Sequence, residues 1–464
     1  MHEKINQFLD SVCSHIKYKP VHQDIRDELA AHIKDLTDEY TKKTQNEETA
    51  LDLAISAMGD CNEIGRQLNK RHKPEPEWSL IVLTAFIVIT GGIVMYASSR
   101  FESAQAIAFD RYLAYAIMGI AVMTGLYFFD YTKLKRLAWP VYFLSLALLV
   151  LILLFGGDIN GRRFFIIGDS AVSTEIITLL FMISFAGIVD KARGKGTIAM
   201  LKLCVLAAIS VLPIMMKLSL SQVLSLLAGY TITIFMAVIK KHFGSNRKRQ
   251  LMLLGIIACL CAFMILSYIF STPYGIGRLL AFVKRGQSDP YGSDFQQFIA
   301  DKWLMASGLF GSTGEKINGG GLDATLPGVT TSYVIINVFV ILGRIAGIAL
   351  IAAIVVYIVR MFIATSRIKN SYGFYLSLAA CTVMAEHFVT GILVNFSLLP
   401  STGVYIPFLS YGGVEYICSM ALIGLILSVW RRNNLIPASP ENTSDNGGFK
   451  MSKMISRGLS FFEL

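Results

Sequence analysis

The stretch LPSTGVYIPFLSYGG, residues 399–413, lies between two long apolar runs near the end of the chain. Its two prolines and three glycines prevent a continuous helix. Non-helical backbone at the edge of a membrane is tolerated only where it is buried in protein or lines a cavity. The stretch therefore predicts a re-entrant turn or, as the sharper interpretation, a segment that shapes a cavity.

Apolar runs recur on both sides of this stretch, and a run of roughly 20 residues is enough to cross a bilayer. They fall at residues 80–98, 112–129, 137–155, 175–190, 200–217, 221–239, 251–271, 332–359, 373–394 and 413–430. Hydrophobic residues make up 54% of the chain and charged residues 16%. The pattern predicts an all-α, polytopic membrane protein with about ten transmembrane helices.

The net charge of +10 is unevenly distributed. Residues 1–78 hold 11 Lys and Arg against 15 Asp and Glu, so the remainder carries 31 cations against 17 acids. The excess cations lie in alternate short loops between the apolar runs, as the positive-inside rule predicts for cytoplasmic loops. We therefore expect a multi-pass membrane protein with both termini cytoplasmic, and no nucleic-acid partner.

Four regions follow from this pattern. We predict a small cytoplasmic helical domain at residues 1–73 and a linker at 74–79. The transmembrane domain is expected at 80–432, followed by a flexible cytoplasmic tail at 433–464. Within the first region, apolar residues recur at three- and four-residue spacing from Ile25 to Leu36. Its DELAAHI and AMGD segments resemble the permease-prefix type of domain. Two interpretations remain open for this domain, a regulatory role and a folded appendage without a ligand.

One connection is far longer than the others. About sixty residues, 272–331, separate the seventh and eighth runs, and we expect them outside the cell. Aromatic and apolar residues are mixed with Gly, Asp and Lys there, which favours an ordered structure over a tether.

The seven cysteines form no CxxC pair and have no histidine at ligand spacing, so neither a zinc site nor a disulfide framework is indicated. Most of them fall in apolar runs, where a thiol is typically a small hydrophobic group.

The run at 399–413 resembles the C-terminal signature of the shape, elongation, division and sporulation family, which includes the FtsW, RodA and SpoVE proteins. Val414 stands where that pattern has a final serine. Two further segments resemble the family. They are NGRRFF with STE after the third run, and RLLAF with SDPYGSDFQ in the long loop.

The resemblance implies a peptidoglycan glycosyltransferase, of inverting stereochemistry, that polymerises lipid II into glycan strands at the outer face of the membrane. Asp289 matches the family's proposed catalytic aspartate. A base is needed there to take the proton of the attacking sugar hydroxyl. The implied substrate-binding residues are Arg162, Arg163, Glu175, Arg278, Lys284, Arg285, Thr402 and Ser410. The cations among them would balance the pyrophosphate of the leaving group.

The resemblance names no metal ligands, and a divalent cation is compatible with the chemistry although no ligand cluster demands one. The implied partners are a class B penicillin-binding transpeptidase and other proteins of division or elongation complexes.

Three departures leave other functions open. Thr178 replaces the family's lysine, and Val340 and Ile341 replace a glutamate pair. A catalytically silent scaffold of a division or sporulation complex is therefore kept as an alternative. A flippase for a lipid-linked precursor is another alternative, because it shares the helix count and needs a polar path that Glu386, His387 and Arg344 could line. The residues do not distinguish elongation from division or sporulation.

Overall fold

The computed structural model describes residues 2–44, 46–71, 74–100, 109–159, 162–167, 170–217, 220–244, 246–271, 276, 295–317, 319–400 and 403–435. The chain divides into two compact units, one formed by Met1–Pro76 together with Arg431–Leu464 and the other by Glu77–Trp430. Each unit has its own packing and is described separately.

The N-terminal unit is a set of short helices around one apolar core. Its elements are α1 (His2–Ser14), η1 (Lys19–Val21), α2 (His22–Thr44), α3 (Glu47–Met58) and α4 (Cys61–Arg71). The spacing from Ile25 to Ile33 places one stripe of α2 in that core. Asn46 caps α3 by accepting a hydrogen bond from the Glu48 backbone N–H at 3.0 Å. Gly59, at φ +91°, ends the same helix.

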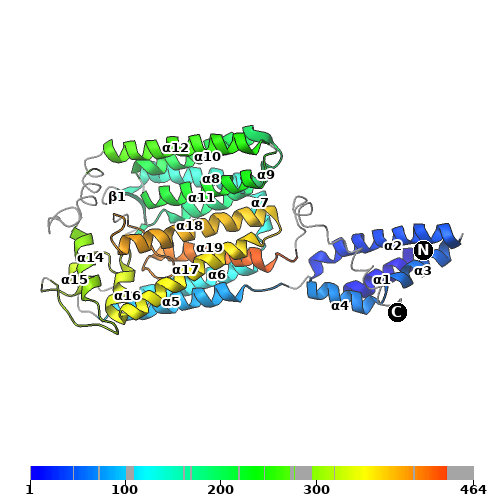
Figure 1. The fold of residues 1–464 in the computed structure, drawn as a ribbon, viewed down its shortest axis with the longest axis horizontal. Coiled ribbons are helices and arrows are strands. Elements are labelled where there is room, and N and C mark those ends of the chain that lie inside the picture. The colour runs from blue at the N-terminus through cyan, green and yellow to red at the C-terminus, as the bar shows by residue number, and fades with distance from the viewer. Residues whose placement is uncertain are drawn as a thin grey trace. The chain divides into compact units, whose positions relative to one another are not determined.

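The larger unit is a bundle of long apolar helices (Figure 1). They are α5 (Trp78–Ser98), α6 (Phe109–Phe128), α8 (Ala138–Phe155), α9 (Glu175–Lys191), α10 (Gly196–Lys217), α11 (Leu220–Ile239), α12 (Arg247–Ser271), α17 (Arg344–Ser366), α18 (Ser371–Asn395) and α19 (Gly413–Arg431). Among the described residues, eight of these ten are long and apolar enough to cross a membrane. The other two are α9, with 17 residues, and α12, with 25. The prediction of a ten-helix polytopic membrane protein is confirmed.

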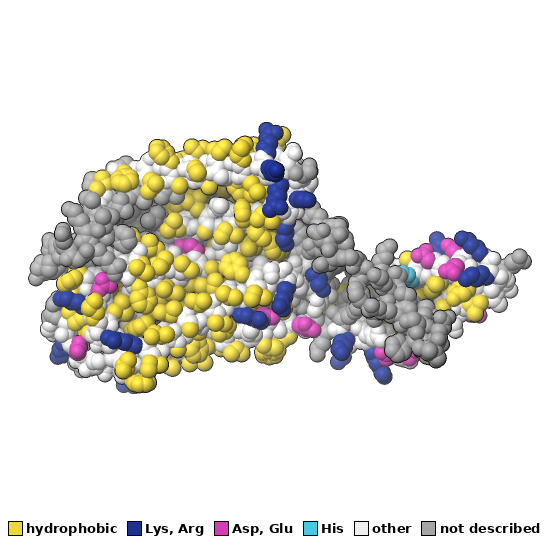
Figure 2. Space-filling view, in the orientation of Figure 1, with side chains coloured by type: hydrophobic (Ala, Val, Ile, Leu, Met, Phe, Trp, Pro, Cys, Tyr) yellow, Lys and Arg dark blue, Asp and Glu magenta, His cyan; other side chains and the backbone are white. Residues whose placement is uncertain are grey.

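Helix α18 forms the centre of the bundle. It packs against α9, α11 and α17, and most of its side chains are buried. Outer helices such as α5 and α12 instead expose apolar side chains, which cover the side of the bundle in Figure 2. An apolar exterior of this kind fits a hydrocarbon solvent rather than water.

The eighth span differs from the predicted run at 332–359. Gly343, at φ +96° and ψ 169°, breaks the run into a short helix α16 (Val334–Leu342) and the spanning helix α17. That backbone region is essentially open to glycine alone. A Cβ at Gly343 would lie 2.6 Å from the Leu309 carbonyl oxygen, so the turn at 308–311 packs directly on this break.

A small sheet joins α8 to α9, and the all-α prediction did not include it. Strand β2 (Arg162–Ile167) pairs antiparallel with β1 (Gly157–Ile159) and with β3 (Ser170–Val172). Apolar runs predict helices by their length, whereas these strands have three to six residues and no long pattern to reveal them.

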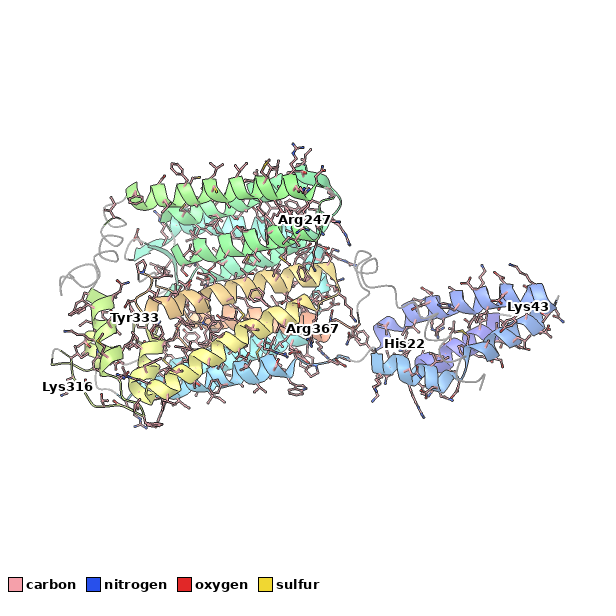
Figure 3. All side chains as sticks on the ribbon, in the orientation of Figure 1. His22, Lys43, Arg247, Lys316, Tyr333 and Arg367 are labelled. Atoms are coloured by element: carbon pink, nitrogen blue, oxygen red, sulfur yellow. The ribbon has the colours of Figure 1, made fainter. Side chains whose placement is uncertain are left out.

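The described part of the long connection is ordered, as expected. Helices α14 (Phe295–Ala306) and α15 (Leu322–Thr325) pack with α16 around the buried Trp303 and Tyr333. The Trp303 indole N–H donates to the Thr325 hydroxyl at 2.9 Å. Figure 3 labels Tyr333 and Lys316 at this end of the bundle, and Arg247 and Arg367 at the opposite end.

Candidate functional site

The signature segment, residues 399–413, connects α18 to α19, and its described part forms a largely buried turn. The Ser410 hydroxyl accepts from the Ile406 backbone N–H at 2.9 Å and donates to the Thr331 carbonyl at 2.7 Å. Phe408 is fully buried at φ +65°, a conformation that costs free energy for a non-glycine residue. Residues 403–412 are thus held as non-helical backbone inside the protein, as the prolines and glycines predicted.

Next to this turn, four helices direct polar side chains toward one another. Glu386 and His387 come from α18, Ser225 from α11, Glu175 from the first turn of α9 and Glu415 from the first turn of α19. Glu175 interacts electrostatically with His387, Glu415 and Glu386. The spans therefore bring together three carboxylates that are far apart in the sequence.

The hydrogen bonds within this group are short. The Ser225 hydroxyl donates to Glu386 Oε2 at 2.6 Å and lies 3.0 Å from His387 Nε2. Thr390 donates to the other oxygen of Glu386 at 3.1 Å. In a hydrolytic triad the carboxylate holds the far ring nitrogen of the histidine. Here Glu386 Oε2 instead lies 3.6 Å from the same ring nitrogen, Nε2, that faces the hydroxyl. The three side chains therefore form a compact polar network rather than a triad.

A small cavity of about 20 Å³ lies within this group. Its walls include Glu175, Glu415 and His387, together with Thr178 and Tyr405. The hydroxyls of Thr178 and Tyr405 are buried and have no protein hydrogen-bond partner in the described part of the chain. A cavity of this size with several polar partners has room for about one water molecule.

The electrostatics of the cavity follow from its lining. Among the described residues that line it, none is a lysine or arginine. Carboxylates that are buried without cations are costly when ionised unless hydrogen-bond donors reach their oxygens. The cavity therefore offers acceptor oxygens to a water molecule or to a hydroxyl group.

The predicted site residues fall into two groups. The positions Arg278, Lys284, Arg285, Asp289 and Thr402 lie outside the described residues. The backbone of Arg162 lies in β2, and its side chain is not described.

The other three predicted residues have defined surroundings. Glu175 lines the polar cavity. The guanidinium of Arg163 donates to the Leu153 carbonyl at the end of α8, which holds β2 against that helix. Ser410 accepts one hydrogen bond from within the turn, from Ile406 N–H, and donates the other to the Thr331 carbonyl in the segment before α16. The structure therefore places Glu175 in a cavity and gives Arg163 and Ser410 internal partners.

Several residues of the polar group were not predicted. Glu415 enters an apolar helix as Glu175 does, so the same signal was present in the sequence. Ser225 gave no such signal, because a lone hydroxyl in an apolar run is ordinary. Tyr405 lies in the signature segment, whose pattern did not single it out. Glu386 and His387 lie within an apolar span, where ionisable side chains face other helices or a polar cavity, and here they face α11. In the described residues no group of three metal-ligand side chains is close enough to hold an ion.

Curated relatives match most of this chain along nearly their whole length. A probable peptidoglycan glycosyltransferase FtsW from Trichlorobacter lovleyi is 27% identical over 373 residues, which are 78% of this chain and 95% of the relative. Stage V sporulation protein E from Bacillus subtilis is 25% identical over 374 residues, 77% of this chain and 98% of that protein.

Solved structures share the fold. A chain from work on structural coordination of polymerization and crosslinking by a peptidoglycan synthase complex is 23% identical, covers 77% of this chain and 98% of its own, and has a TM-score of 0.61. The rod shape determining protein RodA of Thermus thermophilus is 20% identical, with coverage of 77% and 97% and a TM-score of 0.52.

The family of cell cycle proteins named for FtsW, RodA and SpoVE matches residues 77–435, which include every spanning helix, the buried signature turn and the polar cavity. The chain belongs to the FtsW, RodA and SpoVE family of cell cycle proteins.

Proposed function

We propose that this protein is a peptidoglycan glycosyltransferase that polymerises lipid II into glycan strands. The observation that carries the proposal is the carboxylate-lined cavity beneath the family's signature turn, in a chain whose relatives are named peptidoglycan glycosyltransferases. Glycosyl transfer at an anomeric carbon needs a base for the hydroxyl proton, and carboxylates at the head of a bundle can supply one.

Asp289 is the proposed base, because it stands in the DP motif of the long connection. Arg162, Arg163, Arg278, Lys284 and Arg285 are proposed to balance the pyrophosphate that leaves. Glu175 would hold a proton or a sugar hydroxyl at the cavity, and Thr402 and Ser410 would shape the turn beside the substrate. Displacement of an α-linked pyrophosphate in one step would give a β-linked strand, so the enzyme would be inverting.

We place the reaction at the outer face of the bacterial cytoplasmic membrane. Lysines and arginines gather at one end of the bundle, opposite to α14 and the sheet (Figure 2). They belong to α7 (Thr132–Arg136) and to the turns after α9, α11 and α17. Cytoplasmic loops are rich in such cations, which supports cytoplasmic termini and an external α14.

The N-terminal unit is proposed to be a separate cytoplasmic domain. Its own core and capped helices support independent folding. Of the predicted linker 74–79, the last two residues, Trp78 and Ser79, begin α5. Residues 433–464 are proposed to be a flexible tail.

The proposed partner is a class B penicillin-binding transpeptidase. A strand polymerase alone makes no cross-links, and the work on a structural relative concerns a complex that coordinates polymerization and crosslinking. Other division or elongation proteins would assemble with the pair.

The test is glycan growth from lipid II by the purified full chain in detergent or nanodiscs. We expect strands from the native protein and a loss of about 100-fold or more for Asp289→Asn, which is the usual contribution of a general base. Asp294→Asn, five residues further along, is the matched control and should keep activity. Equal activity of both variants would remove Asp289 from the mechanism.

A silent scaffold is the second candidate, and Thr178 favours it. This hydroxyl lines the cavity where the family pattern has a lysine, so the cavity lacks that cation. Under this alternative the native protein would make no glycan, and Asp289→Asn would still support growth in cells that depend on the gene. A flippase would move lipid II across vesicles without chain growth.

A further inference from the structure

A second cavity, of about 160 Å³, lies between α10, α11 and α12. Helices α10 and α12 each pack against α11, so α11 forms the floor of a groove with the other two as its walls. Its lining is almost wholly apolar, from Cys204 and Met215 on α10 to Leu254 and Met264 on α12. The Tyr230 ring also lines it, while its hydroxyl accepts from Ser210 at 3.1 Å.

This groove is suited to hydrocarbon rather than water. A buried water needs two to four polar partners, which the lining does not offer. At the rim, Leu212 and Met264 are 44% and 49% exposed on the apolar side of the bundle. In a bilayer the groove therefore opens to lipid and takes up a chain from it.

The length and direction of the groove fit one leaflet. Along α10 the lining runs from Cys204 to Met215, which is about 16 Å at 1.5 Å per residue. One leaflet of a bilayer has a hydrocarbon depth of about 15 Å. The Met215 end points to the head of the bundle, where α12 ends and leads into residues 272–294 with the DP motif.

We propose that this groove holds part of the polyprenyl tail of the lipid-linked substrate, an inference that rests on the proposed glycosyltransferase function. Helix α11 connects the two sites, because Ser225 faces the polar group while Leu227 and Ile234 line the groove. A lipid-linked sugar can thus have its head at the polar end and its tail one helix away.

The lining favours a branched chain over a straight one. Methionines at the upper end, Met215 and Met264, are flexible and adapt to irregular methyl branches. A 150 Å³ cavity is known to hold a benzene-sized group, so this one encloses about one or two five-carbon units. The rest of the tail stays in the bilayer.

Native thiols make the first test possible without a variant. Cys204 and Cys261 line the groove, whereas Cys259, two residues away on α12, is exposed and does not. The full chain in phospholipid nanodiscs is irradiated with a diazirine-bearing polyprenyl phosphate, and adducts are mapped by mass spectrometry. We expect several-fold more adduct on peptides that contain Cys204, and at Cys261, than at Cys259. An excess of unlabelled polyprenyl phosphate should reduce the labelling of the groove.

A parallel arm uses a diazirine-bearing phospholipid. If it labels the groove as strongly, and polyprenyl phosphate does not compete, the groove holds an acyl chain and the proposal is overturned. Equal labelling of Cys259 and Cys261 by the polyprenyl probe overturns it as well.

The second test fills the groove. Ala207→Phe places a ring among the lining residues, and Ala262→Phe places the same ring on the exposed side of α12. With lipid II as substrate, we expect Ala207→Phe to raise KM about tenfold with kcat within about twofold, as expected for lost burial of one or two methylenes. Ala262→Phe should match the native protein, and an unchanged KM for Ala207→Phe overturns the proposal.

The two proposals fail separately. Glycan growth by the native protein without groove labelling removes the tail site and leaves the glycosyltransferase. Specific groove labelling by a protein that makes no glycan removes the glycosyltransferase, and the groove then stands as a polyprenyl site alone.

Discussion

The carboxylate of Glu386 accepts hydrogen bonds from Ser225 and Thr390 within the central helix of the bundle. A hydrogen bond contributes about 0.5–1.5 kcal/mol net, and a buried donor left without a partner costs about 1–3 kcal/mol. We therefore expect Glu386→Leu to destabilise the protein by about 2–4 kcal/mol.

The measurement is the thermal unfolding midpoint in detergent. Glu315→Leu, on the exposed part of the long connection, is the control and should change the midpoint little. A midpoint for Glu386→Leu equal to that of the native protein would mean that the network adds no stability.

The Ser410 hydroxyl forms one hydrogen bond within the signature turn and one that ties the turn to the Thr331 carbonyl before α16. Ser410→Ala leaves the Ile406 N–H and the Thr331 carbonyl without this partner, so we expect a loss of about 1–3 kcal/mol in unfolding free energy. The KM for lipid II is measured on the same variant. A raised KM with native stability would favour the substrate contact that the sequence suggested.

Among the elements, the break between α16 and α17 depends on one residue. Gly343→Ala forces a Cβ against the turn at 308–311 and a backbone region that only glycine adopts, so we expect a loss of about 1–3 kcal/mol. The thermal unfolding midpoint of the variant in detergent measures this loss of stability.

Gly92→Ala is the matched control for this variant. Gly92 lies inside α5 with open space around its Cβ position. Alanine favours a helix interior over glycine, so the control should be neutral or slightly more stable. If both variants behave alike, the break is tolerant and the turn does not fix α17.

On the scale of the whole molecule, the two units have separate cores. We expect a chain that lacks residues 1–73 to insert, to keep its thermal midpoint within a few degrees and to polymerise lipid II at a rate similar to the full chain. Size-exclusion chromatography, thermal unfolding and glycan growth measure this. Aggregation of the shortened chain would mean that the first unit is needed for folding of the spans.

Orientation is also a property of the whole molecule. Lys316 and Arg367 lie at opposite ends of the bundle (Figure 3). In intact cells we expect a membrane-impermeant maleimide to label Lys316→Cys at once and Arg367→Cys only after permeabilisation, above the background of the native thiols. The reverse pattern would place α14 in the cytoplasm and exclude an external site on this connection.

The sequence by itself determined the number of spanning helices, because an apolar run of about 20 residues has only one stable place in a bilayer. It also determined that residues 403–412 are not helical. Only the tertiary structure decided that Glu415 and His387 join Glu175 around one cavity, with the Ser225–Glu386 hydrogen bond beside it, and that α10 and α12 leave a groove over α11. Periodicity reports which face of a helix is apolar, whereas partners on different helices are set by packing, which no local pattern encodes.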